Sequence, residues 1–412
     1  MNTPALPPHL FRSLLLATLA LLASCADRSR PTPTGNAAAP PQDREPSRAE
    51  PTTEPIQGWA HAVVADDFGL PAPDAPALSA PTPERNRRQL PKLRLFRSNA
   101  NDQTYVARLR TGKDTFRQVV ASWNIITTAP VIIEMRVRHA DDQTFSPWLR
   151  LGHAGPQPSD ELPARRAWDR GAVEVDTIVA DTDLDAWQYR LHLQTESEAD
   201  SADIRRVAVV ASREAAFNPG DPPAAGTAPL DVAFFSQFDA PQDLAPRLCS
   251  PTAAAMALTT LGTPADPLEL ARAARDPDFN LYGNWPRNVQ AAFAHAHNQR
   301  TSQDPAAPAV GGYVTRLATW AEADRHLAAG RALVASVAIE PGEIPNAPID
   351  STPGHLIVIR GFDDNDNANV LVADPAATTS ALGLTAYPAA ALAEAWFSRR
   401  LGTAYVFFPP AG

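Results

Sequence analysis

Hydrophobic and polar positions follow different patterns in two parts of the chain. Between residues 91 and 214, short stretches are strand-like, and two of them, Val131–Arg138 and Trp187–Leu193, alternate apolar and polar side chains with the period of two that is typical of half-buried strands. Between residues 230 and 410, strand-like stretches are interspersed with alanine-rich segments that favour helices. Residues 25–90 and 215–229 lack a hydrophobic period and are rich in proline, so we expect a disordered tether and an interdomain linker. The pattern predicts a multidomain chain, an all-β domain followed by an α+β domain.

The strand-like stretches of the first domain are short and separated by turn-rich loops, which favours an antiparallel β-sandwich over residues 91–214. They are Phe116–Ala121, Val131–Arg138, Trp187–Leu193 and Arg205–Val210. Four tryptophans lie in or beside them, namely Trp123, Trp148, Trp168 and Trp187. Such residues either fill a core or, when exposed on one face, stack on sugar rings.

The N-terminal segment has the features of a signal peptide. Arg12 precedes the apolar run Ser13–Leu22, which is shorter than the roughly 18 residues of a membrane-spanning helix. The run ends in Leu22-Ala23-Ser24-Cys25, which is similar to a bacterial lipobox. We therefore expect residues 1–24 to be a lipoprotein signal and Cys25 to be diacylated, so that the protein is exported and anchored to a membrane of the bacterial cell envelope. The alternative is an ordinary signal peptide with an incidental cysteine.

The number of cysteines and the net charge limit the classes of function that the chain could have. The chain has two cysteines, Cys25 and Cys249, so lipidation of Cys25 leaves Cys249 as an unpaired thiol outside the cytoplasm. Such a thiol is either reactive or buried and inert. The formal net charge of −10 argues against a nucleic-acid partner.

The surroundings of Cys249 favour reactivity. Leu230–Phe235 is expected to form a strand, and the segment from Cys249 is expected to form a helix. Pro251 suits the first helical turn, alanines continue the helix, and Gly262 is a natural stop. A helix N-terminus stabilises negative charge and lowers the pKa of a thiol there. We therefore expect Cys249 to ionise readily.

A thiolate also needs a proton shuttle, and His355 is the best placed histidine. We expect His326, in contrast, to be a solvated residue in mid-helix. His355 opens one strand and Asp374 ends the next, and the midpoint between them falls within the turn 363–369. In an antiparallel hairpin such residues lie near each other, so the carboxylate would orient the imidazole.

The turn itself has a rival interpretation. Asp363, Asn365 and Asn367 echo a calcium loop, but Ala368 replaces the required glycine and Asp374 replaces the bidentate glutamate. A plain polar turn is therefore favoured, and neither a metal nor a cofactor is expected.

Four elements in order, Gln237, Cys249-Ser250-Pro251-Thr252, Gly354-His355 and Asp374-Pro375, resemble the papain-like cysteine peptidase superfamily. They are most similar to its branch of bacteriocin-processing, double-glycine peptidases. The resemblance covers about residues 230–409. It implies Cys249 as nucleophile, His355 as general acid/base, Asp374 as the residue that orients His355, and Gln237 as an oxyanion donor. Ser250 departs from the glycine more common after the cysteine.

These features predict an anchored cysteine hydrolase that cleaves a peptide or isopeptide bond, with peptidoglycan stem peptides as one substrate that the location would offer. Trp285 and the loop Glu340–Gly354 are candidate walls of the cleft, although Trp285 could equally pack against a helix. The competing hypothesis is a non-catalytic surface lipoprotein that binds a ligand through its sandwich and retains an inactive peptidase domain.

Overall fold

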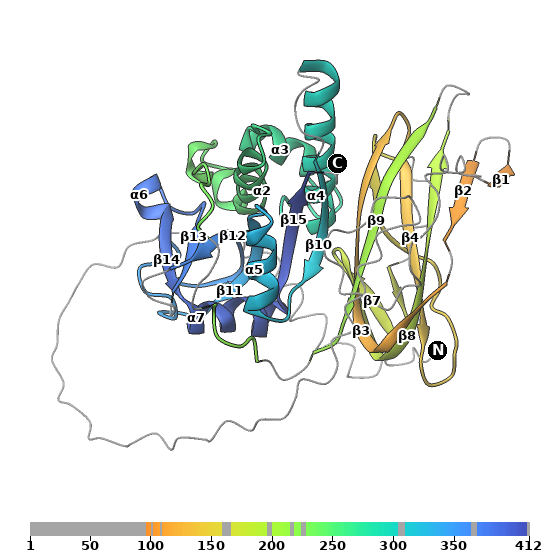
Figure 1. The fold of residues 1–412 in the computed structure, drawn as a ribbon. Coiled ribbons are helices and arrows are strands. Elements are labelled where there is room, and N and C mark those ends of the chain that lie inside the picture. The colour runs from red at the N-terminus through yellow and green to blue at the C-terminus, as the bar shows by residue number, and fades with distance from the viewer. Residues whose placement is uncertain are drawn as a thin grey trace, which may run out of the picture.

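The computed structural model describes residues 96–99, 102–107, 109–158, 166–195, 200–214, 218–223, 228–303, 310–363 and 369–409. The predicted signal peptide, Cys25 and the tether lie outside these residues, as do parts of the predicted linker and most of the turn before Asn369. Two β-sheets organise the described chain (Figure 1). We call residues 96–212 the N-terminal β region and residues 228–409 the C-terminal region. Within the described residues, no helix is long and apolar enough to cross a membrane.

The N-terminal β region is a nine-stranded sheet in which two strands of 18 residues, β3 and β8, make most of the pairings. Its strands are β1 (Phe96–Asn99), β2 (Asp102–Val106), β3 (Arg110–Thr127), β4 (Val131–His139), β5 (Leu149–Ala154), β6 (Ala167–Trp168), β7 (Gly171–Glu174), β8 (Thr177–Gln194) and β9 (Ala202–Ser212). The four predicted strand segments are confirmed within β3, β4, β8 and β9. All nine strands are connected by hydrogen-bonded pairings, because β8 pairs with β7 near its start and with β2 and β4 farther along. The division into two stacked sheets stays a prediction.

Two of the four tryptophans are in the core and two are partly buried, one of them, Trp168, packed against that core. Trp123 and Trp187 are almost fully buried in the core of the N-terminal β region. Trp148 is partly buried, and its ring lies 4.8 Å from the Arg136 guanidinium and 4.6 Å from that of Arg190. Two of the four therefore fill the core, while Trp148 is covered by cations.

The C-terminal region is built on a six-stranded antiparallel sheet in the order β10-β15-β11-β12-β13-β14. Its strands are β10 (Gly311–Arg316), β11 (Leu333–Ile339), β12 (Thr352–Phe362), β13 (Asn369–Ala373), β14 (Leu384–Pro388) and β15 (Thr403–Phe408). Its α-helices are α2 (Cys249–Thr260), α3 (Pro267–Ala274), α4 (Trp285–Asn298), α5 (Trp320–Ala328), α6 (Ser380–Gly383) and α7 (Ala389–Ala393). Short 3-10 turns, η1 (Gln237–Asp239) and η2 (Ala245–Arg247), precede α2, and π-helical turns η3 (Gln299–Gln303) and η4 (Glu394–Ser398) follow α4 and α7.

Both faces of this sheet are buried under helices. Val334 and Val358 pack on one face in a cluster with α2 and α4. Leu333 and Ile357 pack on the other face with α5, α7 and η4. Because side chains alternate along each strand, these central strands are apolar at consecutive positions.

Two sequence expectations for this region were wrong. Leu230–Phe235 forms no strand, although the Leu230 N–H donates to the Arg360 carbonyl at 2.8 Å. Its apolar side chains pack on the face of the sheet that α2 and α4 cover, and its backbone does not pair in a ladder. His326 is 5% exposed and not solvated, because α5 packs against the sheet.

The two regions meet along β3 and β10 (Figure 1). Ser122 and Asn124 of β3 are polar and almost fully buried. The Ser122 hydroxyl accepts a hydrogen bond from the Val314 N–H at 3.0 Å, and Asn124 Oδ1 accepts one from the Gly312 N–H at 3.0 Å. Along β3, successive side chains thus point alternately into the core of the N-terminal β region and toward the C-terminal region.

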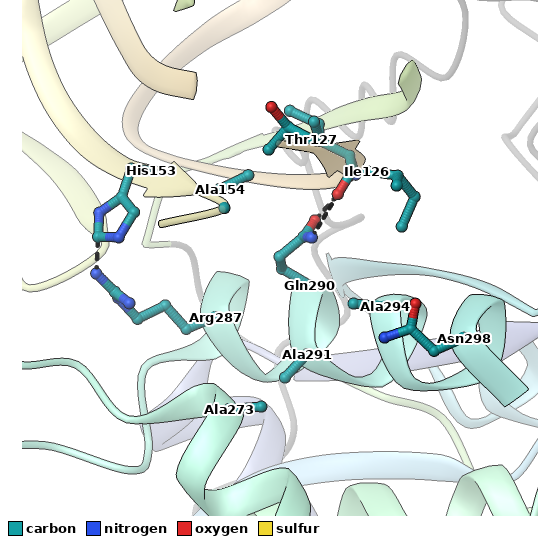
Figure 2. Close-up of a pocket in the computed structure, with 12 residues that line it drawn as sticks. Ile126, Thr127, His153, Ala154, Ala273, Arg287, Gln290, Ala291, Ala294 and Asn298 are labelled. Atoms are coloured by element: carbon teal, nitrogen blue, oxygen red, sulfur yellow. Dashed lines mark hydrogen bonds between the residues drawn. The ribbon is translucent and has the colours of Figure 1, made fainter. Parts of the chain in front are cut away.

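Helix α4 extends this contact, as Figure 2 shows around a cavity of about 270 Å³. Gln290 Nε2 donates to the Ile125 carbonyl at 2.7 Å, and Gln290 Oε1 accepts from the Ile125 N–H at 3.0 Å. One turn earlier, Arg287 contacts His153 Nδ1 at 3.2 Å. Burial, with the charges of Arg287 and Arg150, lowers the pKa of His153 to about 3. His153 is therefore neutral near pH 7 and can accept this hydrogen bond.

Candidate active site

Cys249 is the first residue of α2, as the sequence predicts. The helix ends as expected too, since Gly262 has a φ of 77° and its N–H donates to the Thr259 carbonyl at 3.0 Å. The Thr263 N–H donates to the Leu258 carbonyl at 3.1 Å, which completes a Schellman motif. No side chain caps the N-terminus of α2. Cys249 is thus the residue at the positive end of the helix dipole.

His355 and Asp374 are in direct contact. His355 Nε2 lies 2.8 Å from Asp374 Oδ1, and the two side chains are 0% and 1% exposed. Val358 pairs with Ala373, so Asp374 is level with Ile357, and His355 is its diagonal neighbour on the same face. The sequence places the two residues within a residue or two of register, and the structure places them two apart.

Asp374 is held by further donors. Tyr387 Oη donates to Asp374 Oδ2 at 2.6 Å, and the Ala376 N–H donates to Oδ1 at 2.8 Å. Burial by itself would raise the pKa of Asp374, but the charge and hydrogen bond of His355, together with these donors, outweigh it and lower the pKa. An ionised carboxylate only accepts hydrogen bonds, so His355 Nε2 carries the proton in this contact.

Gln237 is buried in η1, close to the segments that carry Asp374 and Cys249. Its backbone N–H donates to the Pro375 carbonyl at 2.8 Å. Its side-chain Nε2 donates to the Ala245 carbonyl at 3.0 Å, in the turn just before α2. Gln237 thus ties the loop after Asp374 to the start of α2, although it is not among the described residues that line the cavity around Cys249.

A cavity of about 530 Å³ brings Cys249 and His355 together, and we call it the Cys249 cavity. It is lined from both regions of the molecule. The N-terminal β region contributes Gln118, Glu174, Val175, Asp176, Thr177 and Val179. The cavity of the candidate nucleophile therefore has a wall whose residues are at least 70 positions away in the sequence.

The turn between β7 and β8 is part of this wall. Val175 has a φ of 56°, and the Asp176 N–H donates to the Glu174 carbonyl at 2.7 Å, which is a γ-turn with positive φ. Such turns are uncommon, and a β-branched residue with positive φ is strained. The strain is located where the N-terminal β region reaches the Cys249 cavity, which is typical of functional positions.

Asp176 joins this turn to α4. Its carboxylate accepts hydrogen bonds from the Trp285 N–H at 2.9 Å and from the Thr177 hydroxyl at 3.0 Å. The acceptor sits at the N-terminus of α4, where negative charge is favourable. Burial nevertheless raises the pKa of Asp176 to about 6.

Only some of the residues predicted to form the cleft walls line the Cys249 cavity. Trp285 lines the Cys249 cavity, whereas within Glu340–Gly354 only Gly354 does. Sequence reasoning missed Tyr387 and the β7–β8 turn. Neither gave a signal, because Tyr387 belongs to another strand and Val175 replaces the glycine or asparagine expected at positive φ.

Within the ranges that the structure describes, no cluster of three or more histidine, cysteine, aspartate or glutamate side chains could hold a metal ion. The described site brings together a thiol, an imidazole and a carboxylate.

Two family models match the chain. The model of the Peptidase_C39 like family matches residues 229–401. The model of the Peptidase C39 N-terminal domain matches residues 99–212. No curated protein matches the chain.

Proposed function

We propose that Cys249 cleaves a peptide or isopeptide bond with His355 as its acid/base partner. The match of residues 229–401 to the Peptidase_C39 like family supports cysteine peptidase activity. The family match confirms the resemblance to the double-glycine branch of papain-like peptidases. It also favours an enzyme over a non-catalytic binding lipoprotein.

One observation carries the proposal. His355, hydrogen-bonded to Asp374, lines the same cavity as Cys249, and Cys249 begins a helix. A thiol at a helix N-terminus beside an oriented imidazole is the arrangement that a nucleophilic cysteine needs. A buried inert cysteine would need neither neighbour.

The protonation of the two His355 nitrogens defines the proposed roles of His355 and Cys249. Because His355 Nε2 is committed to Asp374, Nδ1 is the nitrogen that would take the proton of Cys249. The thiolate would attack the substrate carbonyl, and the imidazolium would return the proton to the departing amine. Water would then hydrolyse the acyl-enzyme, again with His355 as the base.

Gln237 is proposed as an oxyanion donor together with the Cys249 N–H. An amide nitrogen carries two hydrogens, and Gln237 Nε2 gives one of them to the Ala245 carbonyl. That contact fixes the side chain beside the turn that precedes α2. In comparable sites an oxyanion donor contributes about 2.7–4 kcal/mol of transition-state stabilisation.

The location of the enzyme is also a proposal. We infer export and lipid anchoring from the lipobox-like Leu22-Ala23-Ser24-Cys25, which would bring the site to peptides of the cell envelope, including peptidoglycan stem peptides. A Cys25→Ser variant should move from the membrane fraction to the soluble exported fraction. Its continued sedimentation with membranes would contradict lipid anchoring.

A substrate screen tests the function itself. The parent chain and Cys249→Ala are incubated with purified muropeptides and with a peptide library, and the products are compared by mass spectrometry. We expect cleavage products that the parent forms and Cys249→Ala does not. Identical product profiles from both proteins would contradict cysteine-dependent hydrolysis.

A further inference from the structure

The Cys249 cavity is unusually rich in arginine. Four arginines line it, Arg247, Arg316, Arg399 and Arg400. Three of these guanidinium groups have acceptors within the protein, respectively the Asn280 carbonyl, the Ser212 hydroxyl and the Glu343 carboxylate. Each of these three guanidinium groups thus donates at least one hydrogen bond within the protein.

The fourth, Arg400, is different. Within the described residues its guanidinium makes no hydrogen bond or ion pair, and Nε is buried without a partner. Burial lowers the pKa of Arg400, with no acidic neighbour to oppose the shift. The hydrogen bond with Glu343 instead raises the pKa of the adjacent Arg399. Arg400 is partly buried, and burying a cation even partly without an anion is costly, so its guanidinium is suited to take an anionic ligand.

The position of Arg400 relative to His355 is well defined. A Cβ atom added to Gly354 would lie 2.7 Å from Arg400 Nη2, so the guanidinium packs on the Gly354 backbone. Gly354 immediately precedes His355 and lines the same cavity. Arg400 therefore lies on the imidazole side of the cavity, where His355 would give a proton to the leaving amine.

We propose that Arg400 binds a carboxylate in the half of the substrate that leaves as the amine. The inference rests on the proposed function. A guanidinium presents parallel N–H donors that match the two oxygens of a carboxylate. The substrate class is then a peptide whose released residue carries either a free α-carboxylate or an acidic side chain.

Two alkylating reagents test this without a known substrate. Iodoacetate carries a carboxylate beside its reactive carbon, and iodoacetamide carries a neutral amide there. In both reactions the Cys249 thiolate forms a bond to carbon and iodide leaves. The ratio of the two rate constants at Cys249, measured by mass spectrometry of its peptide, therefore reports attraction of the carboxylate.

We expect Arg400→Gln to lower the iodoacetate-to-iodoacetamide ratio about tenfold, the effect of losing one charge-assisted hydrogen bond. Arg400→Lys keeps the positive charge but lacks the parallel N–H donors of a guanidinium, so it should give an intermediate ratio. Arg399→Gln is the matched control, because it removes a neighbouring charge that Glu343 already balances, and it should change the ratio less than about twofold. Unchanged ratios in both Arg400 variants, or an equal loss in Arg399→Gln, would overturn the proposal.

Peptides distinguish the two carboxylate sources. Quenched fluorescent peptide pools are prepared in pairs, with a C-terminal carboxylate or carboxamide, and with glutamate or glutamine at internal positions. Arg400→Gln should lose about tenfold in kcat/KM on the carboxylate member of one pair and little on its neutral partner. Equal losses on both members would argue against carboxylate binding.

The proposed function fails in a distinguishable way. If His355→Ala reacts with both reagents as fast as the parent, the histidine does not activate Cys249 and the proposed mechanism is wrong. If His355→Ala slows both reagents equally and Arg400→Gln leaves their ratio unchanged, only the role of Arg400 is wrong.

Discussion

At the scale of single residues, Asp374 is the most constrained group of the site. It accepts hydrogen bonds from His355, Tyr387 and the Ala376 N–H, and it is almost fully buried. The hydrogen bond from Tyr387 therefore helps to stabilise the ionised carboxylate and to hold it in position. In turn, burial and the charge of Asp374 raise the pKa of Tyr387, so that Tyr387 remains a donor.

Tyr387→Phe should accordingly destabilise the protein by about 1.5–3 kcal/mol, the value of a hydrogen bond to a charged group. It should also lower kcat/KM, because a less firmly held carboxylate orients His355 less well. Tyr405→Phe is a control for stability, since its hydroxyl lies 2.8 Å from the neutral Ser250 hydroxyl and its loss should cost about 1 kcal/mol. Urea unfolding measures both costs, and equal costs would contradict a charged acceptor at Tyr387.

Val175 stores strain at the cavity wall. Replacing it with asparagine, which tolerates positive φ, should stabilise the protein by about 1 kcal/mol. Because Val175 lines the Cys249 cavity, the same change should alter the relative kcat/KM values of different peptides. Val179→Asn, in the extended β8, should not stabilise. If thermal unfolding shows Val175→Asn to be no more stable than the parent, the positive φ costs nothing.

Predictability from sequence also differs between residues. Cys249, Gly262, His355 and Asp374 could be placed because each depends on local helix or hairpin geometry. Arg400 and Val175 could not, because their importance comes from contacts between segments that are far apart in the chain. His326 shows the same limit, since its burial depends on which face of α5 packs on the sheet.

At the scale of elements, α4 is the main connection between the two regions. Its Gln290 pairs with both backbone groups of Ile125, where a bulge shifts the register between β3 and β9. The side-chain amide thus satisfies a donor and an acceptor of the strand backbone.

Gln290→Ala should lower the free energy of unfolding by about 1–3 kcal/mol for each backbone group that it leaves buried and unpaired. Asn298→Ala, at an exposed position of the same helix, should stay within about 0.5 kcal/mol of the parent. Chemical denaturation gives both values. If the two variants prove equally stable, Gln290 contributes nothing to the contact between regions.

The N-terminus of α4 makes stability depend on pH through Asp176. Its pKa is about 6 in the folded protein and 3.8 without the fold, so the folded state binds the proton more tightly. Stability from this group is therefore present below pH 4 and is lost as pH rises through 6, by an amount on the order of 3 kcal/mol. Relative to the parent, Asp176→Asn should gain stability between pH 4 and pH 7.5. A pH-independent difference between the two unfolding free energies would rule out this titration.

Elements were more predictable than their pairing. Four strands of the first sheet, the hairpin strands β12 and β13, and α2 with its terminating Gly262 could be predicted from local patterns. Leu230–Phe235 has the composition of a strand but packs by its side chains, because no neighbouring strand pairs with it along its length. Local propensity does not determine whether a partner strand is present.

At the scale of the whole molecule, the N-terminal β region is part of the site. The Cys249 cavity has walls from both regions, and Asp176 binds the helix that Trp285 begins. Substrate selection by this peptidase is therefore expected to depend on both regions, and the N-terminal β region is more than a spacer. No local pattern in the sequence indicated that the β7–β8 turn would reach Cys249.

The central claim is that His355 activates Cys249, and the pH dependence of Cys249 alkylation tests it most directly. Iodoacetamide rates are followed from about pH 4 to pH 10 by mass spectrometry of the Cys249 peptide, in the parent and in His355→Ala. We predict a parent thiol that titrates below about pH 7 and a variant that reacts at least about tenfold more slowly at pH 6. A parent thiol that titrates near pH 8.5, or a His355→Ala variant as reactive as the parent, would contradict the account.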